Sequence, residues 1–187
     1  MRLKLAAIIC TVVLFCGCQK TDSDISRALM LRNKLVASNG CSFQAEIVAD
    51  YGEDIYTFTL ECDFNQLGDM TFRVNEPDVI RGIQGKVSEN TGKLTFDDKV
   101  VAFQTMADGQ ITPVMAPWLF IKTLRNGYIN GCSNTDEGLF ISADDSFEEN
   151  ALHLIIWTDD ALTPQKGEIY WQGRRVLTIS VESFSFL

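Results

Sequence analysis

A chain of 187 residues, 46% of them hydrophobic, is long enough to bury the core of one domain and too apolar to be intrinsically disordered. Its 25 acidic residues outnumber its 16 basic ones, which gives a formal charge of −9. An acidic surface repels phosphates, so the charge disfavours nucleic acid and anionic lipid headgroups as partners.

The first eighteen residues have the three parts of an export signal. Arg2 and Lys4 supply positive charge, an apolar run follows over 5–15, and Gly17 places a small residue before Cys18. The last five of these residues, Leu-Phe-Cys-Gly-Cys, resemble the lipobox of bacterial lipoproteins. The resemblance implies cleavage before Cys18 and attachment of lipid, such as palmitate, to that cysteine.

The alternative for this segment is a retained membrane span. The apolar run over 5–18 has only 14 residues, whereas a helix needs about 20 to cross the hydrocarbon core. We therefore expect a signal peptide over 1–17, a lipid-anchored tether over 18–24 and a single domain over 25–187. The mature protein would be extracytoplasmic, anchored by its lipid to the bacterial cell membrane, or to the outer membrane if the source has two.

A helix is predicted directly after the tether. Apolar residues recur at helical spacing from Ile25 to Val36, and Arg32 is the one polar intruder among them. Asn39 and Gly40 then supply a helix stop, because both residues tolerate the left-handed conformation.

From Cys41 onward the apolar period changes to two, which predicts antiparallel strands with one buried and one solvated face. A short helix over 117–125 interrupts them, introduced by Pro117 and closed by Gly127. This order predicts an α+β domain: a strongly curved antiparallel sheet, or half-barrel, with the inserted helix on its concave side. In chain order, strands are expected over 41–49, 56–62, 70–74, 79–87, 94–96, 100–103, 139–142, 151–158, 168–171 and 176–184.

The sequence contains no motif of a known nucleophile, metal or phosphate site. His153 is the only histidine and sits in mid-strand on the face opposite two leucines, which favours a structural or surface role. Four pairs of adjacent acids fall in predicted turns, where solvated carboxylates are ordinary. We therefore expect no enzymatic activity, no cofactor and no metal. The acidic pairs are 97–98, 144–145, 148–149 and 159–160.

Three cysteines remain in the predicted domain, and export permits disulfides. If Ala49 faces Asp54 across the first hairpin, counting outward places Cys41 opposite Cys62 on one apolar face. Directly opposed residues lie within the range that a disulfide spans. We predict a Cys41–Cys62 disulfide with Cys132 free, and the alternative is two buried thiols in contact.

Two segments are similar to the LolA/LolB-like family of lipoprotein carriers, which includes RseB-like domains. Residues 28–37 running into 41–45 look like the family's opening helix and first strand, and 70–77 looks like its strand that ends in proline. The resemblance covers most of 25–184. It implies an apolar concavity under a curved sheet, which in the family holds acyl chains or binds protein partners.

We therefore expect a membrane-anchored lipoprotein that binds a lipid or other apolar ligand in the concavity. The alternative is a protein-interaction module in envelope or spore assembly, like the GerS-type germination lipoproteins, with no ligand. A continuous apolar cavity would favour the first function, and a filled core with an exposed apolar patch the second. The predicted pocket lining comes from the inserted helix: Trp118, Phe120, Ile121 and Leu124.

Overall fold

A computed structural model describes residues 19–88, 93–96, 104–136 and 138–187. The predicted signal peptide over 1–17, the lipobox residue Cys18 and the strand predicted over 100–103 lie outside the described residues.

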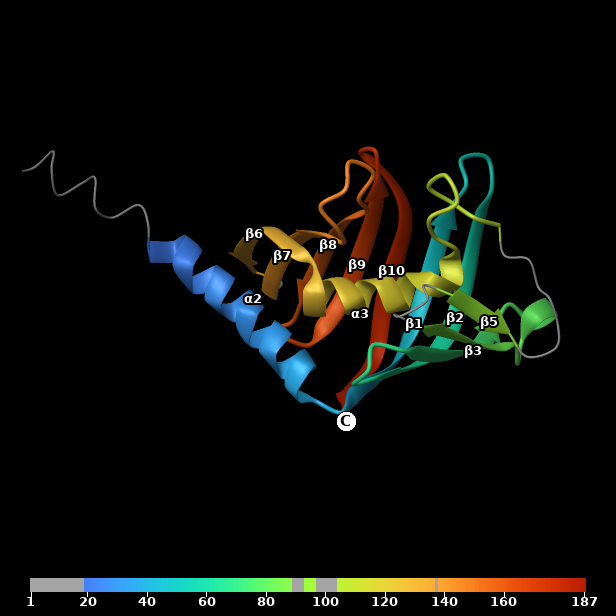
Figure 1. Ribbon diagram of the computed structural model, residues 1–187, viewed down its shortest axis with the longest axis horizontal. Coiled ribbons are helices and arrows are strands. Elements are labelled where there is room, and N and C mark those ends of the chain that lie inside the picture. Colours follow the sequence, from blue (N-terminus) through green and yellow to red (C-terminus); the bar gives the residue numbers. More distant parts are fainter. Residues whose placement is uncertain (1–18, 89–92, 97–103, 137) are drawn as a thin grey trace, which may run out of the picture.

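The body of the domain is one antiparallel sheet, in which ten strands are described (Figure 1). Their spatial order is β5-β4-β3-β2-β1-β10-β9-β8-β7-β6, so the first and last strands pair in the middle. The chain runs outward from β1 to the edge strand β5, and then inward from the opposite edge strand β6 to β10. The strands are β1 (Gly40–Asp50), β2 (Ile55–Asn65), β3 (Met70–Glu76), β4 (Gln84–Ser88), β5 (Lys93–Phe96), β6 (Tyr128–Thr135), β7 (Gly138–Asp144), β8 (His153–Thr158), β9 (Pro164–Trp171) and β10 (Arg174–Phe186).

Two α-helices complete the domain. Helix α3 (Ala116–Asn126) crosses the concave side of the sheet, and α2 (Gln19–Ala37) packs against β6 and α3 (Figure 1). Short 3-10 turns are formed by η1 (Asp78–Ile80) and η2 (Pro113–Met115). The predicted α+β class, with a curved antiparallel sheet, an N-terminal helix and a short inserted helix, is confirmed.

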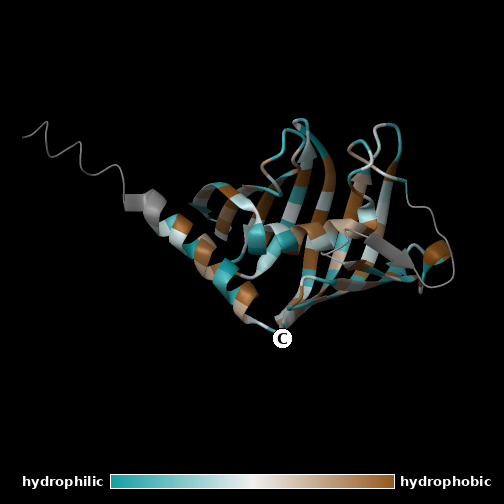
Figure 2. Ribbon diagram, in the orientation of Figure 1, coloured by the Kyte–Doolittle hydropathy of each residue, from teal (hydrophilic) through white to brown (hydrophobic). Residues whose placement is uncertain are grey.

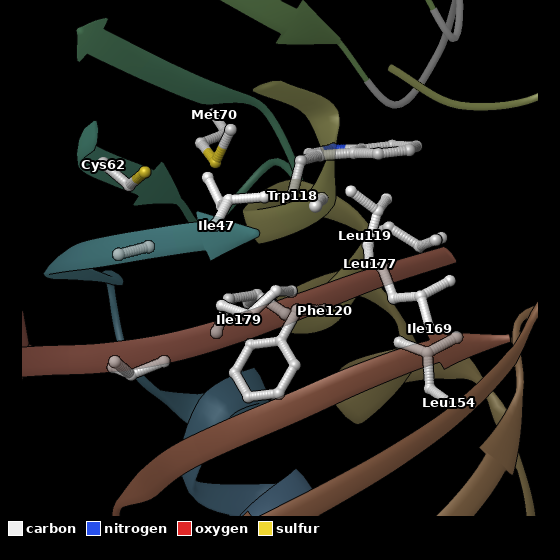
Figure 3. Packing of buried hydrophobic residues seen from close by; sticks show 14 of the residues in the cluster. Ile47, Cys62, Met70, Trp118, Leu119, Phe120, Leu154, Ile169, Leu177 and Ile179 are labelled. Atoms are coloured by element: carbon white, nitrogen blue, oxygen red, sulfur yellow. The ribbon is translucent and has the colours of Figure 1, made fainter. Parts of the chain in front are cut away.

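The core lies between α3 and the concave face of the sheet. Apolar and polar residues alternate along the strands (Figure 2), so one face of each central strand enters the core. Phe120 of α3 is fully buried and points toward β9 and β10 beside Ile179 (Figure 3). Its ring lies against Gly167 of β9, where an added Cβ would be 2.6 and 2.7 Å from two ring carbons.

The structure departs from the predicted elements most clearly at three places. Helix α2 begins at Gln19, so the segment predicted as a tether is helical where it is described. The strand predicted over 79–87 begins only at Gln84, because η1 follows Pro77 and leaves Val79 89% exposed. The edge strand β6 was not predicted, since its glycine and asparagines are poor strand formers.

The first hairpin is offset by two residues from the predicted pairing. Ala49 lies opposite Tyr56 rather than Asp54. The turn begins one residue later than predicted, and Tyr51 N donates to Asp54 O over 2.9 Å to close it. A two-residue offset keeps every side chain on its predicted face, because the side-chain period of a strand is two.

The predicted Cys41–Cys62 disulfide is wrong, because this offset separates the two cysteines. Cys41 lies opposite Phe64 and Cys62 opposite Phe43, so the cysteines are diagonal neighbours. Diagonal positions are about 7–8 Å apart, beyond the usual span of a disulfide. Both residues and Cys132 are free thiols. Burial raises the pKa of Cys41 to about 12 and raises that of Cys62 well above its ordinary value, which keeps both protonated.

Gly167→Ala is expected to lower the free energy of unfolding by about 1–3 kcal/mol, because the new methyl group overlaps the buried ring of Phe120. Denaturant unfolding measures the loss. Gly131→Ala in β6 is the matched control, since its Cβ would meet only the Ser142 Cβ at 4.0 Å. Equal losses in the two variants would contradict the packing argument.

Candidate functional site

A pocket of about 320 Å³ opens at the rim of the half-barrel. Three chain reversals, distant in sequence, meet there: the β1–β2 hairpin, the turn over 106–111 and the β9–β10 hairpin (Figure 1). Its lining combines apolar side chains with charged residues. The lining residues are Asp50, Tyr51, Met106, Ala107, Asp108, Trp171, Gln172, Arg174 and Val176.

Polar contacts join the three reversals to one another. Arg174 donates to the carboxylate of Asp50 over 2.9 Å and to its backbone carbonyl over 3.2 Å. The hydroxyl of Tyr51 donates to Gln104 O over 2.9 Å, which fixes the residues that lead into the 106–111 turn. The N–H of Gly52 and the guanidinium of Arg174 both lower the pKa of Asp50, so this carboxylate stays charged at neutral pH.

The 106–111 turn is unusually apolar for a chain reversal, because Met106, Ala107 and Ile111 are buried. Met106 N donates to Ile111 O over 2.7 Å, and three successive residues from Ala107 to Gly109 adopt positive φ. A second pocket of about 210 Å³ lies on the other side of this turn. Its lining is Gln110, Ile111, Met115, Trp118, Leu119, Lys122, Asp145 and Leu152.

Trp171 lines the rim pocket, and its indole N–H is a notable polar group there. It is buried and has no hydrogen-bond partner within the described part of the chain. A buried donor without a partner costs about 1–3 kcal/mol. A ligand acceptor that reaches this N–H after a local rearrangement of the rim would recover part of this cost.

The predicted pocket residues of α3 divide between the second pocket and the core. Trp118 lines the second pocket, and its indole N–H donates to Gly68 O over 2.9 Å. Phe120 and Ile121 are fully buried, and Leu124 is 4% exposed, so these three belong to the packed layer between α3 and the sheet. The concave side is filled along this part of the helix.

Sequence reasoning missed the rim pocket. Its residues come from three turns whose meeting depends on the strand order. The one local signal was the apolar character of Met106 and Ala107 beside Gly109, where a turn usually carries polar residues.

Arg32, the polar residue on the apolar side of α2, has a defined role at the end of α3. Arg32 donates to Leu124 O over 2.9 Å and to Gly127 O over 2.7 Å. The last carbonyls of a helix have no intrahelical partner and carry partial negative charge. Arg32 therefore satisfies the C-terminal end of α3 and fixes α2 against it.

Arg32→Met is expected to cost about 1.5–3 kcal/mol of folding free energy, because it keeps the apolar stem and removes two charged hydrogen bonds. Arg27→Met is the control on the same helix, where the guanidinium donates to two exposed acceptors, Asn134 Oδ1 and Asp160 O. Thermal unfolding compares the two variants. A loss for Arg27→Met as large as that for Arg32→Met would contradict the assigned role.

Within the described residues, the single histidine and two of the acidic pairs have structural contacts. His153 lies half exposed on the outer, convex face, bonded to Asp144 over 2.7 Å. Asp145 accepts from Leu152 N and Asp159 from Thr163 N, both over 2.8 Å, so these acids stabilise turns.

Residues 19–88, 93–96, 104–136 and 138–187 contain no group of three or more side chains suited to a metal ion. Over the same ranges, no helix combines the length and the hydropathy that a bilayer crossing requires.

No family model matches the chain, and no curated protein does. Solved structures show similarity at low identity. An uncharacterized conserved protein from Thermus thermophilus is 12% identical over 86% of this chain and 87% of its own, with a TM-score of 0.44.

Two further solved structures carry names related to the resemblance seen in the sequence. A putative outer membrane lipoprotein-sorting protein domain from Vibrio parahaemolyticus is 7% identical over 88% of this chain and 92% of its own, with a TM-score of 0.43. A LolA superfamily protein from Nitrosomonas europaea is 8% identical over 86% of this chain and 93% of its own, with a TM-score of 0.41. Nothing about function follows from similarities at these TM-scores.

Proposed function

We propose that the protein is an extracytoplasmic lipoprotein, anchored through Cys18, that binds a lipid or other apolar molecule at the rim of its curved sheet. The rim pocket carries this proposal. Its volume of about 320 Å³ lies at the lower end of small-molecule sites, which span about 300–1,000 Å³. Tyr51, Met106 and Val176 give it apolar walls, and the unpaired N–H of Trp171 favours a ligand with one acceptor.

The ligand is placed at the rim rather than deep under the sheet. Beneath the sheet, the buried side chains of Phe120 and Ile121 occupy the concave side. A carboxyl or ester group beside Trp171, with the first part of an acyl chain along Met106 and Val176, fits the chemistry of the pocket.

A second function is favoured by a different observation. Ile25, Leu29 and Val36 lie along one side of α2 and are 39%, 43% and 46% exposed. An exposed apolar stripe beside a filled concave side is the arrangement that favours a protein-interaction module in envelope or spore assembly, with no ligand.

Anchoring is expected to depend on Cys18. Each buried CH₂ contributes about 0.8 kcal/mol, and stable attachment takes two or more acyl chains. Cys18→Ser should leave an uncleaved precursor without lipid, detected by intact mass and by metabolic labelling with a fatty-acid analogue. Cys16→Ser is the control, because that residue leaves with the signal. Normal cleavage and labelling of Cys18→Ser would refute the anchor.

Ligand binding predicts that an apolar molecule stays bound when the full chain is extracted in mild detergent. Native mass spectrometry should detect it as an added mass. Trp171→Phe keeps an aromatic side chain, although a smaller one, and removes the N–H, so it should weaken binding roughly threefold to tenfold, the equivalent of one hydrogen bond.

Trp157→Phe makes the same change on the convex face and should leave the occupancy unchanged. An unliganded chain, or equal occupancy in the wild type and Trp171→Phe, would contradict ligand binding at the rim and favour the protein-interaction function.

A further inference from the structure

Three side chains on the convex face form a continuous hydrogen-bonded row. Ser142 and Asp144 are two residues apart on β7, so both project from the same face, and Asp144 lies directly opposite His153 of β8. His153 Nδ1 is 2.7 Å from Asp144 Oδ1, and His153 Nε2 is 3.4 Å from Ser142 Oγ. The row therefore runs from hydroxyl to imidazole to carboxylate.

The carboxylate determines which nitrogen of His153 carries the proton. An ionised Asp144 can only accept, so a neutral His153 must donate from Nδ1. The lone pair of Nε2 then faces Ser142, whose hydroxyl can donate to it. This is the arrangement in which an imidazole acts as general base toward a serine.

Neighbouring strands support the carboxylate and the imidazole. Asn130 Nδ2 donates to Asp144 Oδ2 over 2.6 Å, so both oxygens of this carboxylate are engaged. Asn130 lies where the pairing of β6 with β7 shifts between Ile129 and Gly131, and such bulges re-aim side chains. On the other side, Tyr170 of β9 lies opposite His153, with ring centroids 6.3 Å apart.

The surroundings of Ser142 leave room for a reacting group. Gly131 lies opposite it on β6, and a Cβ there would still be 4.0 Å from the Ser142 Cβ. On the other side lies Ile155 of β8, and the next pair on the same face is Phe140 with Trp157, whose rings are in edge contact with centroids 5.7 Å apart. These half-buried apolar side chains can support an acyl group beside the hydroxyl.

We propose that Ser142 is an activated nucleophile that accepts acyl groups from esters, with His153 as its general base and Asp144 as the residue that positions His153. Ser142 Oγ bonds to the carbonyl carbon while its proton moves to His153 Nε2. The ester C–O bond breaks, and the leaving alkoxide takes that proton. Water then cleaves the acyl-serine by the same route. The proposal is independent of ligand binding at the rim.

The test uses the full chain in an ester-free detergent, with p-nitrophenyl butyrate as the probe. An activated ester is chosen because Ser142 lies on an open sheet face and not in a closed pocket. We expect nitrophenolate release and one butyryl group mapped to Ser142. General-base catalysis is worth about 10²–10⁴-fold, so His153→Gln should slow acylation at least tenfold. Ser142→Ala should abolish it, and Ser180→Ala, an exposed serine on β10, should leave it unchanged.

A positioning role for Asp144 has its own control. Asp144→Asn should lower the acylation rate while the unfolding temperature changes little. Asp145→Ala should lower only the unfolding temperature, because it removes the acceptor of Leu152 N that holds a turn. Circular dichroism establishes that each variant is folded. Butyryl groups found on other residues, or an acylation rate unchanged in folded His153→Gln, would overturn the proposal.

Discussion

The packing of α3 into the concave face is the constraint on which the rest of the domain depends. Because Gly167 has no side chain, the ring of Phe120 packs directly on the backbone of β9 and brings the helix close to the sheet. Arg32 then fixes the end of the helix, and Trp118 ties it to Gly68. Because α3 fills the middle of the half-barrel, space for a ligand remains where the strands end and the turns meet.

The fold class could be predicted from the sequence because periodicity reports which face of an element is buried. His153 was placed correctly on the face opposite Leu152 and Leu154, both of which are buried. The pairing of β1 with β2 could not be predicted as securely. A two-residue offset gives the same buried face, so the alternation could not distinguish Cys62 from Phe64 as the partner of Cys41.

Both functional arrangements depend on contacts between segments that are distant in sequence. The rim pocket needs Tyr51, Met106 and Trp171 to meet. The central pairing of β1 with β10 brings the turns of Tyr51 and Trp171 together, and the hydrogen bond from Tyr51 to Gln104 brings in the turn of Met106. The row of Ser142, Asp144 and His153 needs the register of β7 with β8. Residue types alone indicated a structural histidine. The hydrogen-bond partners of this histidine, Asp144 and Ser142, can be identified only when the register of β7 with β8 is known.

The central pairing of β1 with β10 has a consequence for the order of folding. Leu187 N donates to Gly40 O over 2.9 Å, and Asn39 N donates to Leu187 O over 3.1 Å, so the last residue closes against the start of the first strand. Contacts of such long sequence separation slow folding. During synthesis, β1 has an unpaired edge until nearly the whole chain is available. If the chain is exported before it folds, β10 can pair with β1 only after both strands have crossed the membrane. The sheet would then be completed after translocation.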